Sequence, residues 1–156
     1  MNTERDLPMA LRAAYLSLHR ASDASFASYG VTADQFVLLA TLSLGQALTQ
    51  RELASRMSSD PSTVRAMLVL LDLSGLVKRQ SHPSDARAKT VALTAAGKRK
   101  LQQLWKAGQQ IRDKMFGCLE PSDAGTLVQL LRRVANSLTE ENVASFDAIS
   151  NSISVN

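Results

Sequence analysis

The 156-residue sequence contains one cysteine, Cys118, two histidines and few aromatic residues, which make up 4% of the chain. A single cysteine excludes an intramolecular disulfide and a cysteine-only metal cage. No apolar run approaches the roughly 18 residues that a membrane-spanning helix needs. The first residues carry charges where a signal peptide would have an apolar stretch. We therefore expect a cytoplasmic protein that does not enter the membrane.

The sequence also lacks the short motifs that mark common enzymes. It has no glycine-rich phosphate loop, no His-Glu-x-x-His pair and no nucleophile elbow. His82 and Asp85 have no further histidine or cysteine nearby to complete a metal site. These absences predict a non-enzymatic protein with no catalytic residues, no cofactor and no metal.

What is present is a basic centre in an ordinary globular composition. Apolar residues make up 45% of the chain, which is long enough for one domain with its own core. Residues 45–100 hold ten Lys or Arg and four Asp or Glu, a net charge of +6, while the whole chain carries +4. This asymmetry favours a polyanionic partner over a merely solvated basic face.

Periodicity and capping residues predict mostly helices and one hairpin. Thr32 with Gln35 and Thr49 with Glu52 match the capping box that begins a helix, and Asp60-Pro61 is a strong start signal. Thr94 is expected to cap one long helix, and the segment after residue 140 to fray or add a short helix. The predicted elements in chain order are helices 7–28, 33–44, 49–57 and 61–73, strands 76–80 and 89–93, and helices 94–119 and 123–138.

Two short helices followed by a hairpin describe a winged helix-turn-helix, a mainly α fold with a small β-hairpin wing. In the second helix of this motif, predicted over 61–73, Val64, Leu68 and Leu71 form one stripe that we expect to be buried. Ser62, Thr63 and Arg65 lie in its first turns, where a helix favours phosphate. An arginine there can bond the O6 and N7 atoms of guanine as a fork.

Five segments carry a resemblance to the multiple antibiotic resistance regulator (MarR) family. They are VTADQFVLLATL (31–42), LTQRELASRM (48–57), DPSTVRAMLVLLDLSGLVKR (60–79), the Asp85-x-Arg87 pair and VALTAAGKRKL (91–101). The resemblance implies a homodimer whose first, fifth and last helices interlock. It places a DNA-binding domain at 31–93 between dimerisation regions at 1–30 and 94–156.

The resemblance also implies a function. Such proteins are mostly repressors that bind pseudo-palindromic double-stranded DNA and are released by small ligands, often aromatic acids, or by thiol oxidation. Asp85 would orient the wing, and Arg87 would reach the minor groove, whose negative potential attracts arginine. An Asp two residues away can also hold that guanidinium as a fork. Arg51, Arg79 and Lys89, together with Lys78 and 98–100, would contact phosphates.

The sequence departs from the family pattern in the recognition helix, the helix predicted over 61–73, and in the wing. Val69, Leu70 and Leu73 stand where polar residues are common. Either they pack against the wing and the long helix, or Val69 contacts a thymine methyl group. Ala86 replaces the first of the two arginines that often follow the wing Asp.

An effector cleft and the cysteine complete the sequence predictions. The candidates for the cleft, each of which could instead belong to the core, the surface or a dimer interface, are Tyr15, His19, Phe36, Met67 and Trp105. Cys118 is expected to be a small buried hydrophobe rather than a redox switch. The alternatives to a ligand-released repressor are a redox-responsive regulator and a winged-helix module that binds protein.

Overall fold

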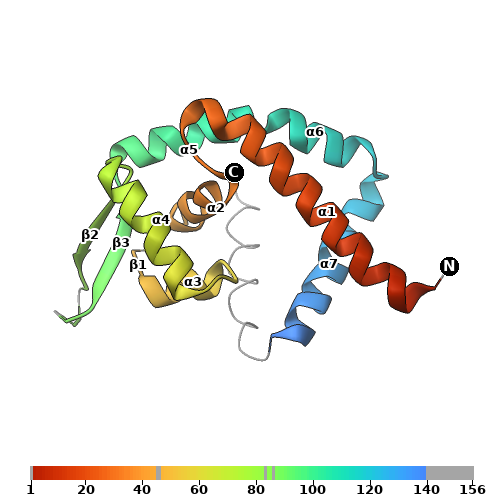
Figure 1. The fold of residues 1–156 in the computed structure, drawn as a ribbon, viewed down its shortest axis with the longest axis horizontal. Coiled ribbons are helices and arrows are strands. Elements are labelled where there is room, and N and C mark those ends of the chain that lie inside the picture. Colours follow the sequence, from red (N-terminus) through yellow and green to blue (C-terminus); the bar gives the residue numbers. More distant parts are fainter. Residues whose placement is uncertain (1, 45–46, 83, 86, 140–156) are drawn as a thin grey trace.

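In the computed structural model, helices surround one small antiparallel sheet (Figure 1). The structure describes residues 2–44, 47–82, 84–85 and 87–139. Its elements are α1 (Thr3–Phe26), the 3-10 turn η1 (Ala27–Tyr29), α2 (Ala33–Leu42), β1 (Leu48–Thr49), α3 (Gln50–Arg56), α4 (Pro61–Leu73), β2 (Val77–Ser81), β3 (Lys89–Leu93), α5 (Ala95–Ala107), α6 (Gln109–Gly117) and α7 (Pro121–Leu138). This arrangement confirms the predicted mainly α fold with a hairpin wing.

The sheet joins the wing to the helix-turn-helix. β2 and β3 form the hairpin, with Val77 opposite Leu93 and Ser81 opposite Lys89. β1 pairs with the other edge of β3. Since α3 begins directly after β1, the wing and the first helix of the motif share one support.

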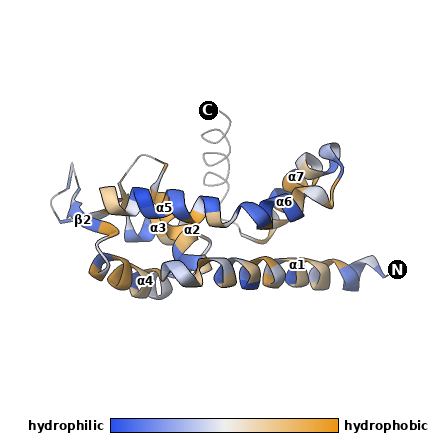
Figure 2. Ribbon diagram, turned by 90° about the horizontal axis from the view of Figure 1, so that it is seen from above, coloured by the Kyte–Doolittle hydropathy of each residue, from blue (hydrophilic) through white to orange (hydrophobic). Residues whose placement is uncertain are grey.

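The core lies between the sheet, α2, α3, α4 and α5, where leucine side chains fill the interior. Its fully buried side chains are Leu38, Leu39, Leu53, Val64, Leu68, Leu71, Thr90 and Leu104. α1 buries only Phe26, at its C-terminal end, and extends from there toward the end of the molecule where α6 and α7 lie (Figures 1 and 2). The winged module therefore has its own core, and most of α1 leaves it.

Local capping fixes where several helices begin and end. Both predicted capping boxes are present, at Thr32 before α2 and at Thr49 before α3. α4 runs from Pro61 to Leu73 as predicted, and Gly75 follows it with a φ of 71°, a left-handed conformation that glycine adopts without strain. α1 begins four residues earlier than predicted, at Thr3. Gly45, which directly follows the helix predicted over 33–44, and the segment after residue 140 lie outside the described residues.

The prediction of one long helix after Thr94 is wrong, because the chain breaks into α5 and α6 at Gly108. Gly108 has a ψ of 0°, and the Arg112 guanidinium donates a hydrogen bond of 2.7 Å to the Trp105 carbonyl oxygen. The same guanidinium lies over the Trp105 ring, 4.0 Å from its centroid. The arginine thus supplies a partner for a carbonyl at the break, where glycine already weakens the helix.

An extensive apolar surface covers the end of the molecule opposite the wing. No residue of α7 is buried within the described part of the chain. Figure 2 shows apolar residues recurring along α1 and α7. The exposed large apolar side chains of α1, α6 and α7 are Leu7, Met9, Tyr15, Leu18, Met115, Phe116, Leu127, Val128, Leu130, Leu131 and Leu138. Large exposed apolar patches of this kind are typical of interaction sites.

Cys118 is exposed, so the prediction of a buried cysteine is wrong. It follows α6 beside the exposed Met115 and Phe116, and its thiol donates a hydrogen bond of 3.2 Å to the Met115 carbonyl oxygen. The sequence suggested apolar packing around the thiol, but these neighbours face away from the core. None of the helices in the described ranges is both long and apolar enough to cross a membrane.

Candidate nucleic-acid interface

α3 and α4 form a helix-turn-helix whose turn is closed by backbone hydrogen bonds. The Ser59 N–H donates to the Ala54 carbonyl oxygen at 2.9 Å, and the Ser58 N–H donates to the Ser55 carbonyl oxygen at 3.1 Å. Ser58 itself has a φ of 51°, in the left-handed region that favours glycine. The turn is therefore tightly defined and contains one strained residue.

Asp60 caps the N-terminus of α4, as predicted from the Asp-Pro pair. One carboxylate oxygen accepts from the Thr63 N–H at 2.9 Å, and the other accepts from the Thr63 hydroxyl at 2.6 Å. These two bonds, the hydroxyl one first, hold the pKa of Asp60 below its usual value. Thr63 was predicted to contact DNA, and its hydroxyl hydrogen is already engaged here. The exposed Ser62 and Arg65 beside it remain available.

α4 separates into a buried and an exposed face. Val64, Leu68 and Leu71 are at most 2% exposed, which confirms the predicted buried stripe. Val69 is 45% exposed and Leu73 is 81% exposed. The first explanation of these apolar residues, packing against the wing and the following helix, is therefore wrong for the chain described. The outer face of the helix is largely apolar and open.

The wing tip is held by Asp85, but through the backbone. The Asp85 carboxylate accepts a hydrogen bond of 2.9 Å from the Arg87 N–H, and its carbonyl oxygen accepts one of 3.1 Å from the Ala88 N–H. We expected the Asp85 carboxylate to form a fork with the Arg87 guanidinium. Among the described residues, these two groups form no ion pair. Asp85 thus shapes the turn, and the exposed Arg87 side chain keeps its charge unpaired. Ala86 lies outside the described residues.

Most of the basic side chains predicted to contact phosphates are exposed, and Lys100 is half-buried. Arg51 lies on α3, Arg79 on the edge strand β2 and Lys89 at the start of β3. In the described part of the chain, the only side chain that lies within ion-pair distance of carboxylates is His19, beside Asp23 and Asp34. No lysine or arginine there is paired with a carboxylate. Lys100 is an exception to the predicted phosphate group, because its Nζ atom donates to the Tyr29 carbonyl oxygen at 3.3 Å. The other basic side chains of this group have no carboxylate ion-pair partner within the described ranges.

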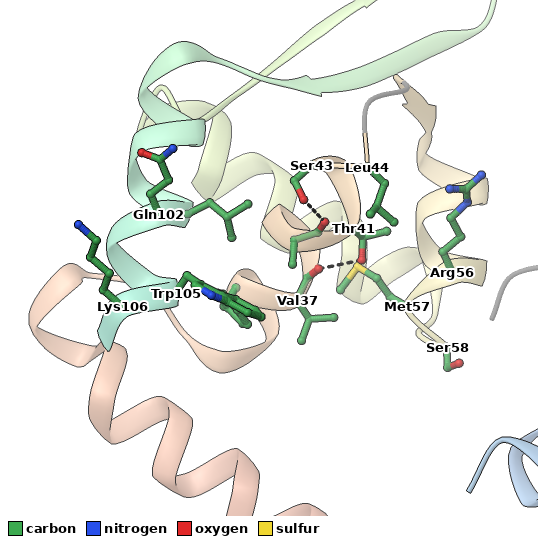
Figure 3. A pocket seen from close by; sticks show the side chains of 13 residues that line it. Val37, Thr41, Ser43, Leu44, Arg56, Met57, Ser58, Gln102, Trp105 and Lys106 are labelled. Atoms are coloured by element: carbon green, nitrogen blue, oxygen red, sulfur yellow. Dashed lines mark hydrogen bonds between the residues drawn. The ribbon is translucent and has the colours of Figure 1, made fainter. Parts of the chain in front are cut away.

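A large pocket lies between α2, α5 and the turn after α3 (Figure 3). Its volume is about 1020 Å³. The Thr41 hydroxyl donates to the Val37 carbonyl oxygen and the Ser43 hydroxyl to the Ala40 carbonyl oxygen, which leaves the floor apolar. The lining residues are Phe36, Val37, Ala40, Thr41, Ser43, Leu44, Arg56, Met57, Ser58, Leu101, Gln102, Trp105 and Lys106.

The structure brings together two of the five predicted effector contacts. Phe36 and Trp105 both line the pocket, with ring centroids 6.4 Å apart. Tyr15 stacks instead on His19, along α1. Met67 is buried in the core and does not line this pocket.

His19 connects the first two helices. Its Nε2 atom lies 3.3 Å from the Asp23 carboxylate, and its Nδ1 atom lies 3.8 Å from the Asp34 carboxylate of α2. The second oxygen of Asp23 accepts a hydrogen bond of 2.7 Å from the Ala33 N–H, at the N-terminus of α2. His19 is thus placed as a link between α1 and α2.

The cationic residues of the pocket were not predicted from the sequence. Arg56 and Lys106 line it from α3 and α5. The sequence did carry a signal for the apolar walls of the pocket. Phe36 and Ala40 are four residues apart on one face of a helix, and so are Leu101 and Trp105. That spacing shows which residues share a face but not that the two faces meet.

The arrangement is that of a winged helix-turn-helix module, and comparisons with known proteins agree. The MarR family model matches residues 31–89. The multiple antibiotic resistance protein MarR of Escherichia coli K12 is 30% identical over 105 residues, which cover 67% of this chain and 73% of that protein.

Two solved structures have the same fold over most of their length. A cysteine-to-serine mutant of MarR from E. coli, complexed with operator DNA, superposes with a TM-score of 0.74 at 25% identity and covers 86% of this chain and 98% of the other. BpsR of Bordetella bronchiseptica, whose DNA binding is regulated by 6-hydroxynicotinic acid, gives a TM-score of 0.77 at 26% identity, with 87% and 96% covered. The chain belongs to the MarR family of transcriptional regulators.

Proposed function

We propose that this chain is a homodimeric repressor that binds a pseudo-palindromic DNA site and is released by a small aromatic acid. The observation that carries the proposal is the capped helix α4, which exposes Ser62 and Arg65 beside a wing with an unpaired Arg87. In helix-turn-helix proteins, the N-terminal residues of the second helix contact base edges in the major groove. The relative of known structure bound to operator DNA has the same fold.

Each predicted contact residue has a role in this proposal. Arg65 reads guanine from the major groove, and Ser62 and Thr63 lie where the helix N-terminus attracts phosphate. Arg87 enters the minor groove, with Asp85 fixing the turn that presents it. Arg51, Arg79 and Lys89 bind phosphates, which fix the position of the protein without reading sequence.

The apolar surface on α1, α6 and α7 is the proposed dimer interface. It is formed by residues within 1–30 and 94–156, the two regions assigned to dimerisation. A second copy of the chain would cover these side chains and place two copies of α4 for two half-sites. Obligate dimer interfaces are more apolar than other protein surfaces.

The pocket between α2 and α5 is the proposed effector site. Its apolar walls and aromatic side chains suit a planar ring, and Arg56 and Lys106 suit a carboxylate. BpsR, with the same fold, is regulated by the aromatic acid 6-hydroxynicotinic acid. Met57 and Ser58, in the turn before α4, also line the pocket, so a ligand there would bias the position of the recognition helix.

Operator binding is tested with duplexes from the neighbourhood of the gene that encodes the chain. We expect nanomolar-range binding to one such duplex, on the order of 10⁻⁸ M or tighter, and affinity that falls steeply with salt. Equal affinity for a scrambled duplex at every salt concentration would contradict the proposal. The Arg65→Ala chain is the matched variant, because its exposed side chain can be removed without disturbing the core.

Effector binding is tested through Trp105, the single tryptophan of the chain, which lines the pocket. Aromatic carboxylic acids should change its fluorescence at the concentrations that release DNA in a band-shift assay. Lys106→Ala should weaken both effects, while Lys114→Ala, on α6 and outside the pocket lining, should leave them unchanged. Failure of the whole class of acids in both assays would reject this ligand class.

A further inference from the structure

The strip of α4 that points directly away from the core is nearly devoid of hydrogen-bonding groups. Ser62, Ala66, Val69 and Leu73 are spaced by four, three and four residues, so they follow one line along the helix opposite the buried stripe. All four residues are exposed. Only Ser62 can donate or accept a hydrogen bond. Bases facing this strip can therefore be distinguished mainly by apolar contact.

The charges around the strip indicate which partner covers it. Arg65 flanks it on the same helix, and no carboxylate in the described part of the chain forms an ion pair with this arginine. The acidic residues of this region of α4 are Asp60, which is engaged in the cap, and Asp72 near the C-terminus. With the net charge of +6 over residues 45–100, the surroundings are complementary to a polyanion rather than to an ordinary protein surface.

The major groove of duplex DNA is a polyanionic surface with one apolar group among its base edges, the C5-methyl of thymine. Along the helix axis, Ala66 and Val69 are separated by about 4.5 Å, from three residues of roughly 1.5 Å rise. This separation is close to the spacing of about 3.4 Å between successive base pairs. Two neighbouring thymines can therefore face these two side chains.

We propose that Ala66 and Val69 determine operator specificity by seating thymine methyl groups in each half-site. This inference rests on the proposed DNA-binding function and names the base that its recognition helix selects. Cytosine, which lacks the C5-methyl group, is rejected at these positions, while Arg65 reads guanine beside them.

The test replaces thymine by deoxyuridine, a change that removes only the methyl group. The 156-residue chain first selects a consensus duplex from a random pool. Each thymine of that consensus is then replaced in turn, and the dissociation constants are compared. Loss of one buried methyl should weaken binding about fourfold at the thymines that face the strip. Replacement in both half-sites should weaken it about fifteenfold.

Val69→Ala is the matching protein variant, and Leu70→Ala is its control. Both residues are exposed on α4, but Leu70 lies off the outward strip. The thymine-to-uracil ratio at the affected position should fall toward one in Val69→Ala and stay at the wild-type value in Leu70→Ala. Far-UV circular dichroism on heating verifies that both variants fold. The comparison of the thymine duplex with the deoxyuridine duplex can also be made with the wild-type protein alone.

The outcomes separate this inference from the function on which it rests. If the wild type enriches no consensus, the proposed DNA-binding function fails, and the inference fails with it. If a consensus emerges but every thymine-to-uracil ratio is near one, the inference alone is overturned. It is also overturned if Val69→Ala leaves the ratio unchanged and alters the sedimentation of the free protein, because the strip would then be a protein-contact surface.

Discussion

Gly97 shows how tightly α5 packs against the wing, and its replacement by alanine provides a sharp test of the structure. A Cβ atom added at this position would lie 2.0 Å from the Leu76 carbonyl oxygen and 3.3 Å from the Leu93 side chain. The first neighbour is backbone, which cannot rotate aside. Thr94 ties the same region together, because its hydroxyl donates to the Gly75 carbonyl oxygen at 2.6 Å and accepts from the Gly97 N–H.

The expected loss of stability follows from two opposing effects. Replacing glycine by alanine inside a helix normally stabilises it by about 1 kcal/mol. Overpacking of a filled site costs about 1–3 kcal/mol, and a clash with backbone belongs at the upper end of that range. The net destabilisation should therefore be about 2 kcal/mol. For a chain of this size, such a loss lowers the Tm by about 4–8 °C.

The measurement is urea denaturation followed by far-UV circular dichroism, at equal protein concentration because association changes the apparent stability of a dimer. Gly125→Ala in α7 is the control, since nothing in the chain lies within 4 Å of a Cβ added there. Helix propensity alone predicts that both variants become more stable. Gly97→Ala at least as stable as the wild type would refute the close contact between α5 and Leu76.

Three further changes test the interface. Arg87→Ala should weaken operator binding severalfold and lower the slope of log K against log salt concentration by about one, as measured by fluorescence anisotropy; an unchanged slope would contradict a phosphate or minor-groove contact. Ser58→Gly should stabilise the chain by about 1 kcal/mol in urea denaturation, because glycine adopts the φ of 51° without strain; a less stable variant would argue against that turn. Asp60→Ala should lower the Tm at neutral pH, but the deficit should shrink in strong acid. The folded-state pKa of Asp60 is lowered, so its stabilisation is present above the usual carboxyl pKa and lost as the pH falls through the folded one; a deficit independent of pH would contradict the cap.

The sequence was sufficient wherever structure depends on residues a few positions apart. The capping boxes at Thr32 and Thr49 and the Asp60 cap each involve partners three residues apart. The buried stripe of α4 was likewise predictable, since helical periodicity alone sets it. These local signals fixed the order of elements and hence the position of the helix-turn-helix and the wing.

Features that depend on distant contacts were not predictable in this way. Nothing in the apolar period from residue 94 to 119 reveals that Arg112 folds back on Trp105 and that the helix breaks at Gly108. The pocket required knowing that the exposed sides of α2 and α5 face each other. Cys118 was misjudged for the same reason, because its apolar neighbours point outward.

At the wing, Asp85 bonds the backbone N–H of Arg87 and not its guanidinium as predicted. This difference supports the proposed function. A carboxylate two residues before an arginine reaches the backbone N–H of that arginine through a short local turn, and this is the bond that forms. A fork to the guanidinium would neutralise Arg87 and would have to be broken, at some cost in free energy, before the side chain could approach DNA. With the carboxylate engaged by the backbone, the turn is shaped while the cation stays unpaired. In the proposed function, Arg87 would therefore enter a groove without first losing a partner.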